Sequence, residues 1–99
     1  MMAKVNIIIG RREGQYSIPA NIIAENRTVY YARNDGFERG GEEWADEYDF
    51  VINDDYLLED WMFNNMDWSD IKPHATKLPT KPTIDSGQWD DTEIIKVER

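Results

Sequence analysis

The amino-acid sequence predicts a single α+β domain, in which a small antiparallel sheet packs against two or three helices. Three observations support this class: an alternating branched segment near the N-terminus, apolar residues at helical spacing in the middle, and a second alternating segment near the C-terminus. A chain of 99 residues has room for one hydrophobic core. We expect residues 1–78 to form the compact domain. Residues 79–99 are expected to form a linker-like segment and a C-terminal strand or tail.

The N-terminal segment predicts a β-hairpin. Residues Lys4 to Gly10 read KVNIIIG, a run of branched residues that is typical of a strand. A polar turn ends at Gly14, and Gln15 to Ile18 resumes the alternation. Two short alternating runs joined by a turn with glycine are expected to pair as an antiparallel hairpin.

Pro19 predicts the start of a first helix, because the N–H that proline lacks would be unpaired at the first helical position anyway. The apolar stripe expected on this helix consists of Ile22, Ile23, Asn26, Val29, Tyr30 and Arg33. The sequence Asn34-Asp35-Gly36 predicts its end, since glycine readily adopts positive φ. A strand is the alternative for Thr28 to Ala32, which reads TVYYA, but the flanking signals favour the helix.

A second helix is expected from Glu42 to Val51, with acids in its first turn, where the helix dipole favours them. Its apolar stripe consists of Trp44, Ala45, Tyr48, Val51 and Ile52. Acidic residues fill the other face. Alternation between Tyr48 and Ile52 leaves an extended segment as the alternative.

A third helix is expected to begin after Asn53 or Asp54, either of which can cap it, and to run to about Met66. One side of this helix is formed by Leu57, Leu58, Trp61, Met62 and Asn65. The polar residues Asn64-Asn65 and Asp67 to Ser69 are expected to end it.

The remaining residues suggest two more extended segments. Asp70 to Leu78 is expected to be extended and able to pair with the first strand. Thr80 to Gln88 resembles a linker. Glu93 to Glu98 alternates, so it predicts either a last strand or a loose tail.

The motifs that mark common catalytic sites are missing from the sequence. The chain has no cysteine, which excludes disulfides and thiolate chemistry. His74 is its one histidine, and no nucleophile-elbow or phosphate-loop motif is present. We therefore expect a non-enzyme without cofactor or metal. A divalent-metal site remains as a weaker alternative, although its residues lack the order of a calcium loop: Asp54, Asp55, Glu59 and Asp60.

The composition also predicts where the protein is found. No apolar stretch approaches the roughly 18 residues of a membrane span, and the apolar run near the N-terminus is too short for a signal-peptide core. We expect a soluble intracellular protein.

Acidic residues are concentrated in one third of the chain. Between Gly40 and Ile71 there are eleven carboxylates and no Lys, Arg or His, and this segment supplies nearly all of the net charge of −9. Such a segment repels nucleic acid and acidic membranes and attracts basic surfaces. A merely solvated face would usually mix both signs, because like charges about 6 Å apart repel by roughly 0.7 kcal/mol even in water. The segment therefore predicts a surface that binds a basic partner.

The spacing of these acids suggests nucleic-acid mimicry, because carboxylates at i, i+3 and i+4 on a helix recur at a spacing similar to that of phosphates. One such row is Glu42, Asp46 and Asp49, and another is Asp55 and Glu59. Apolar residues outside the expected stripes are candidate hot spots, with core packing as the alternative: Phe50, Phe63, Met66 and Trp68. The predicted partner-binding set is Glu42, Glu43, Asp46, Glu47, Asp49, Asp54, Asp55, Glu59, Asp60, Asp67, Asp70, Phe63 and Trp68.

An adaptor that binds a basic partner without mimicry is the alternative function. Mimicry predicts two rows of carboxylates on a convex face and competition with DNA, whereas an adaptor predicts one acidic patch around an apolar hot spot. A homodimer with twofold symmetry would double the length of any acidic row.

Two segments resemble small acidic proteins of tailed bacteriophages. These are IPANIIAENRTVYYARNDG (Ile18 to Gly36) and INDDYLLEDWMFNNMDWSDI (Ile52 to Ile71). The resemblance covers about Lys4 to Leu78 and brings no activity or functional residue with it. It implies a setting, the cytoplasm of a bacterial host. Small acidic phage proteins often inhibit host or defence enzymes that handle nucleic acid, so the expected partner is a basic nucleic-acid-binding protein of the host or its defences, with no direct contact to nucleic acid or membrane.

Overall fold

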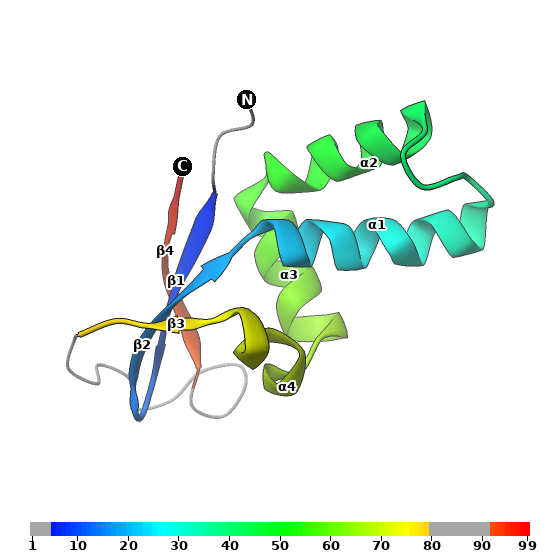
Figure 1. Ribbon diagram of the computed structural model, residues 1–99. Helices are drawn as coiled ribbons and strands as arrows, with labels where there is room; N and C mark the ends of the chain where they lie inside the picture. Colours follow the sequence, from blue (N-terminus) through cyan, green and yellow to red (C-terminus); the bar gives the residue numbers. More distant parts are fainter. Residues whose placement is uncertain (1–4, 80–91) are drawn as a thin grey trace.

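The computed structural model describes residues 5–79 and 92–99 and has the expected α+β architecture (Figure 1). In chain order the elements are β1 (Asn6–Arg11), β2 (Gly14–Pro19), α1 (Asn21–Asp35), α2 (Glu42–Ile52), α3 (Asp55–Asn65), α4 (Trp68–Ile71), the 3-10 turn η1 (Lys72–His74), β3 (Thr76–Lys77) and β4 (Glu93–Glu98).

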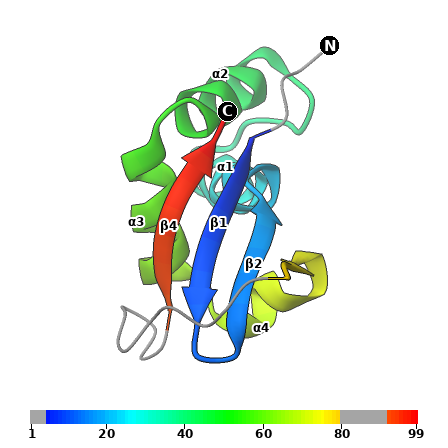
Figure 2. The same ribbon diagram turned by 90° about the vertical axis from the view of Figure 1, so that its left-hand side faces the viewer.

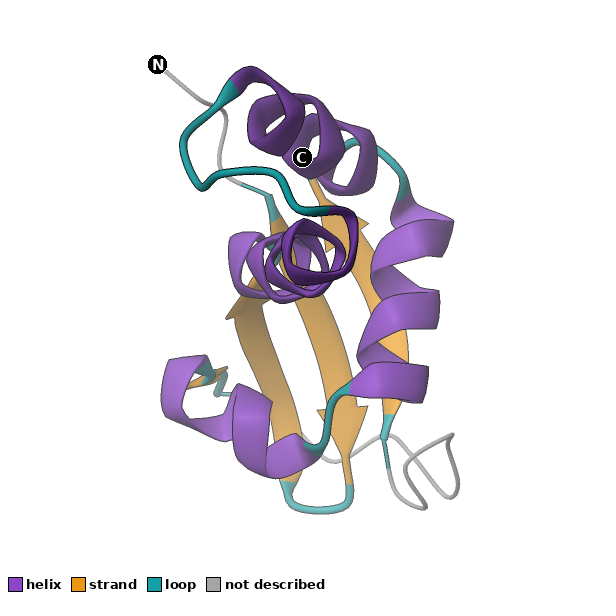
Figure 3. Cartoon of the chain, turned by 90° about the vertical axis from the view of Figure 1, so that its right-hand side faces the viewer, coloured by secondary structure: helices purple, strands orange, loops and turns teal. Residues whose placement is uncertain are grey.

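The four strands form one antiparallel sheet in the order β3-β2-β1-β4. Ile7 on the central strand β1 is in register with Ile18 on β2 and with Val97 on β4. Because strand side chains alternate, these residues share one face of the sheet. Figure 2 shows the sheet from the side where no described helix lies, and Figure 3 shows the side that the helices cover.

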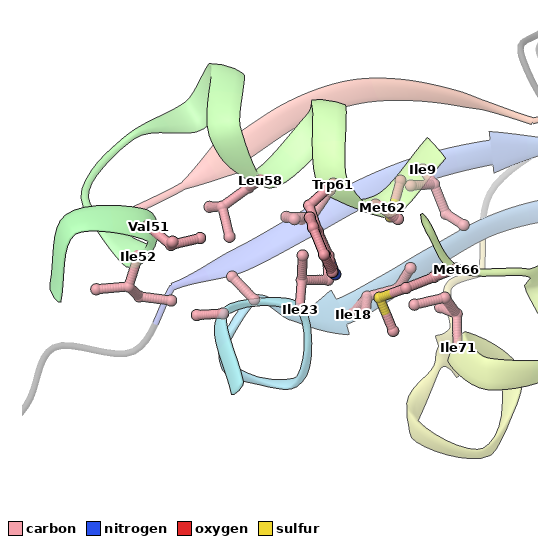
Figure 4. Close-up of a cluster of buried hydrophobic side chains, with 13 residues drawn as sticks. Ile9, Ile18, Ile23, Val51, Ile52, Leu58, Trp61, Met62, Met66 and Ile71 are labelled. Carbon is pink, nitrogen blue, oxygen red and sulfur yellow. The ribbon is translucent and has the colours of Figure 1, made fainter. Parts of the chain in front are cut away.

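The core lies between this face and the helices. Fully buried residues come from every layer of it, including Ile18 from β2, Ile23 from α1, Val51 from α2, and Leu58 and Met62 from α3 (Figure 4). Burying one such side chain stabilises the fold by roughly 1.5–3 kcal/mol. The core thus joins the C-terminal end of α2 and the middle of α3 to the sheet.

The predicted first helix is confirmed as α1, but the residue predicted to start it is wrong. Gly36 follows the helix with φ of 78°, as its position suggested. Pro19 is the last residue of β2 and not the first residue of the helix, which begins at Asn21. The sheet pairing continues past Pro19, because Ala20 donates its backbone N–H to the Val5 carbonyl at 2.8 Å. A proline without N–H is tolerated at such a strand end.

The buried face of α1 is rotated relative to the predicted stripe. Its buried residues are Ile23, Ala24 and Thr28, whereas Tyr30 is 51% exposed. The small side chains allow close packing, and the Thr28 hydroxyl donates to the Ala24 carbonyl at 2.7 Å, so its polar atom is satisfied. The strand alternative for Thr28 to Ala32 is wrong.

Helices α2 and α3 are confirmed almost as predicted. Helix α2 continues to Ile52, so the extended alternative is wrong. On its predicted stripe Val51 and Ile52 are buried, while Ala45 is exposed. Asp54 caps α3 by accepting a hydrogen bond from the Leu57 N–H at 3.1 Å.

The region after α3 differs from the prediction. Residues 68–74 are helical, and only Thr76–Lys77 is a strand, which pairs with β2 and not with β1. The expected end of the third helix is confirmed, because α3 stops at Asn65 and Met66 and Asp67 are extended, but Asp67 and Asp70 then form a capping box that starts the unexpected helix α4. The second edge of β1 is taken by β4, which confirms the strand alternative there. The predicted linker Thr80 to Gln88 lies outside the described residues.

Candidate interaction surface

The acidic segment contributes α2, which packs against α1, so that the two helices lie side by side and extend beyond the sheet (Figure 1). Only the last two residues of α2 are buried. The rest of α2 therefore turns one face to its neighbours and the other to solvent.

Four carboxylates of α2 are exposed and form no ion pair with any residue that the structure describes: Glu42, Glu43, Asp46 and Asp49. We call this set the acidic face of α2. Asp46 and Asp49 lie four and seven residues after Glu42, a spacing that stacks side chains along one side of a helix. One of the two predicted rows is thus present as a free row.

Glu47, the fifth acid of α2, belongs to a different environment. Its Oε1 accepts a hydrogen bond from Arg27 Nη1 on α1 at 2.6 Å, and the Arg27 side chain is only 13% exposed. An ion pair this sheltered is screened less by solvent than a surface pair. Glu47 therefore links α2 to α1.

The second predicted row is not free. Asp55 forms an ion pair with Arg99 at the end of β4, and Arg99 also donates to the Ile52 carbonyl at 2.8 Å. Glu59 is half-buried. These contacts join the α2–α3 junction to the edge of the sheet, so this row has a structural use.

The other carboxylates of the predicted set have local partners. Asp60 accepts a hydrogen bond from Asn64 Nδ2 at 3.0 Å. Asp70 accepts one from the Asp67 N–H at 2.9 Å within the capping box. Asp54 caps α3. The structure therefore separates the acids of α2 from those of α3 and α4.

The described residues include no group of three or more His, Cys, Asp or Glu side chains that could hold a metal ion. The four acids of the metal alternative, near the start of α3, thus form no such group. In the described part of the chain, no helix has the length and apolar character needed to cross a membrane.

Three aromatic rings lie around Arg27, at the junction of α1, α2 and α3, and a fourth packs against two of them. The Arg27 Cζ lies 4.5 Å from the ring centroid of Tyr31, 5.9 Å from that of Phe50 and 6.0 Å from that of Trp61. The centroid of Tyr30 lies 5.4 Å from that of Trp61. We call Tyr30, Tyr31, Phe50 and Trp61 the aromatic cluster.

Trp61 anchors the aromatic cluster to the core. It is 8% exposed, and its Nε1 donates to Asn26 Oδ1 on α1 at 2.9 Å. Figure 4 shows its indole reaching from α3 toward α1, beside Ile23. By contrast, Phe50 is 59% exposed and Tyr30 is 51% exposed. The cluster therefore has a fixed base and an open surface.

Of the predicted hot-spot candidates, Phe50 is exposed, whereas Phe63 and Trp68 are less accessible. Phe63 and Trp68 are half-buried and pack against the core. Trp68 lies edge-on to Tyr16, at 5.2 Å between centroids, with Arg11 at 4.2 Å from its ring. Met66, a further candidate, is buried. Sequence reasoning missed Tyr30, because it placed that residue on the buried stripe of α1.

The charge of the acidic face affects a neighbouring tyrosine. Burial, followed by the negative charges of Glu25 and Asp49, raises the pKa of Tyr48 above its ordinary value. Tyr48 is half-buried and packs against the core. Of these two carboxylates, Glu25 is paired with Arg39, whereas Asp49 forms no ion pair with a described residue.

An open groove of about 440 Å³ lies where α1 ends and α2 begins. Its lining residues are Val29, Ala32, Arg33, Gly36, Phe37, Arg39 and Trp44. Arg39 lies 5.3 Å from the Trp44 ring and forms an ion pair with Glu25. Two arginines in its lining make this groove unsuited to a basic partner, unlike the acidic face.

Comparison with known proteins adds no further constraint: no protein-family model, curated protein or solved structure matches this chain.

Proposed function

We propose that this chain is a non-enzymatic binding protein whose acidic face of α2 occupies a basic, nucleic-acid-binding site on another protein and inhibits it. The observation that supports this most directly is that four exposed carboxylates lie on one short helix without an ion-pair partner among the described residues. In the setting that the sequence resemblance implies, the target is a host or defence protein in the cytoplasm of a bacterium.

The energetics support this proposal. Like charges three or four residues apart on a helix destabilise it by a few tenths of a kcal/mol per pair. Within the chain, Arg27 forms an ion pair with Glu47, and Arg99 forms one with Asp55. No described cation forms an ion pair with the acidic face. A basic partner would relieve this repulsion, and the opposite charges would also speed association.

One feature of the arrangement supports an adaptor as a second candidate. Only the row of Glu42, Asp46 and Asp49 is free, because Asp55 of the second row is paired with Arg99. Phe50 lies four residues after Asp46 and is 59% exposed. One acidic patch beside an apolar hot spot fits a partner that has a basic surface with an apolar contact, whether or not DNA binds there. The second candidate function is therefore an adaptor for a basic partner.

Affinity capture from a bacterial lysate tests the proposal, with elution over a salt series. Three baits are compared: the wild type, the variant E42Q/D46N/D49N, and the matched variant D35N/E38Q/E93Q, whose three acids are exposed and lie outside the acidic segment. The proposal predicts a basic, nucleic-acid-binding partner that salt releases and that the first variant alone fails to retain.

Competition separates the two candidate functions. Inhibition at a nucleic-acid site predicts that DNA or RNA displaces the chain from its partner, and an adaptor predicts that neither does. A partner that both variants retain equally, or that high salt does not release, would contradict both candidates.

A further inference from the structure

We propose that the aromatic cluster binds an arginine side chain of the basic partner, with the guanidinium stacked on Phe50 and paired with a carboxylate of the acidic face. This inference rests on the proposed function, because it names the chemical group that the partner inserts. The proposed position lies at Phe50, beside the acidic face, and attraction between opposite charges alone would not favour it over other parts of that face.

Arg27 shows within the molecule how this surface holds a guanidinium. Its Cζ lies 4.5 Å from the Tyr31 centroid and 5.9 Å from the Phe50 centroid, both within the range of cation–π attraction. Its Nη1 is bound to Glu47 Oε1 at 2.6 Å. An arginine between aromatic rings, paired with an acid of α2, is thus already part of the structure.

Phe50 has room for a second guanidinium. It is 59% exposed despite its proximity to Arg27, so much of the ring is open to solvent. A helical side chain leans toward the N-terminal turn, over the residues three and four positions earlier. For Phe50 these residues are Glu47, which is paired with Arg27, and Asp46, which forms no ion pair with a described cation. A partner arginine at Phe50 would therefore meet Asp46.

The rings beside the site are held in place. The hydrogen bond from Trp61 to Asn26 and the packing of Tyr30 and Tyr31 on the Trp61 ring position these three aromatics, and Arg27 connects them to Phe50 at 5.9 Å. Preorganised aromatic and arginine groups dominate the energy of protein interfaces. The position is therefore suited to a single anchoring side chain.

Arginine fits this position better than lysine. Its guanidinium is planar, weakly hydrated and able to stack on a ring while it pairs with a carboxylate, whereas the lysine ammonium is a strongly hydrated point charge. At an exposed ring a cation–π contact contributes a factor of about two to five in affinity. The inference therefore predicts a preference for arginine that charge alone cannot produce.

The test titrates the intact chain with two decapeptides of equal charge, one of alternating Gly and Arg and one of alternating Gly and Lys. Calorimetry or NMR shifts give the two dissociation constants. We expect the wild type to bind the arginine peptide more tightly than the lysine peptide, by up to about fivefold. Phe50→Ala and Phe50→Leu should abolish this preference and keep the weaker binding to both peptides. The leucine variant retains apolar bulk, so it isolates the ring.

Tyr56→Ala is the matched control, because Tyr56 is 71% exposed and has no ring contact to Arg27. Its arginine preference should equal that of the wild type. Equal affinity of the wild type for both peptides, or a preference that survives in both Phe50 variants, would overturn the inference and leave the proposed function standing. If neither peptide binds at low salt, both proposals are wrong.

Discussion

Helices α2 and α3 have equal lengths of 11 residues and both come from the acidic segment, yet their carboxylates do different things. On α3, Asp55 is paired with Arg99, and Asp60 accepts a hydrogen bond from Asn64. On α2, only Glu47 has an ion-pair partner among the described residues. The acidic segment contains no cation of its own, but the fold brings arginines from other segments next to some of its acids.

Position in the fold explains the difference. Helix α3 buries Leu58, Trp61 and Met62 along its length, so its flanks come close to the end of β4 and to α1. Helix α2 buries only its last two residues. Its N-terminal part lies away from the sheet and its cations, which leaves the acidic face available to a partner.

The largest expected effect is a difference in stability between a variant in the core face of α3 and a variant in the open face of α2. Leu58→Ala removes a fully buried side chain and should reduce the free energy of unfolding by about 3 kcal/mol. Phe50→Ala removes an exposed ring and should change it by less than about 0.5 kcal/mol. Urea denaturation of both variants measures the difference. Similar losses would mean that Phe50 is a core residue and not an interaction surface.

A smaller effect is expected at the cap of α3. Asp54→Ala removes the acceptor for the Leu57 N–H and should reduce the free energy of unfolding by about 1 kcal/mol. Asp54→Asn is the control, because asparagine caps equally well and removes the same charge. If the asparagine variant is destabilised as much as the alanine variant, the charge of Asp54 and not its cap would be responsible.

On α2, removal of an acid is expected to raise the free energy of unfolding. Asp46→Gln removes repulsion from Glu42 and Asp49, so it should raise the free energy of unfolding by a few tenths of a kcal/mol at low salt. The gain should shrink as salt screens the remaining charges. Denaturation at two salt concentrations measures both. A loss of stability would show that Asp46 has an internal partner.

The smallest expected effect is a shift in the titration of Tyr48. Burial, Glu25 and Asp49 raise the pKa of Tyr48, so the folded state holds its proton to higher pH than the unfolded state. Its contribution to stability is therefore complete below the unfolded pKa and is lost as pH rises through the folded pKa. Asp49→Asn should lower the pKa of Tyr48, measured by NMR titration, without returning it to the ordinary value, since burial remains. An unchanged pKa would mean that Asp49 does not act on this ring.

The hairpin and helices α1, α2 and α3 could be predicted because their signals are local. The cap at Asp54 and the glycine after α1 lie within a turn of the helix end that they mark. The partners of the acids could not be predicted this way. Arg27 and Glu47 are 20 residues apart, and Arg99 and Asp55 are 44 apart, so only the tertiary fold brings each pair together. The exposure of Tyr30 was missed for a related reason, since close packing at Ala24 and Thr28 rotates the buried face of α1.

The most direct test of the account asks whether binding depends on the acidic face of α2 or on total charge. The dissociation constant for the arginine decapeptide is measured at low salt for the wild type, for E42Q/D46N/D49N and for D35N/E38Q/E93Q, all after denaturation curves have shown that they fold. Both variants lose three negative charges. If each contact at the acidic face contributes about 0.5 kcal/mol, the first variant should bind about tenfold more weakly. The second should weaken binding less than the first, because its three acids lie outside the acidic face. Equal weakening of the two variants would contradict the account and show that binding follows net charge alone.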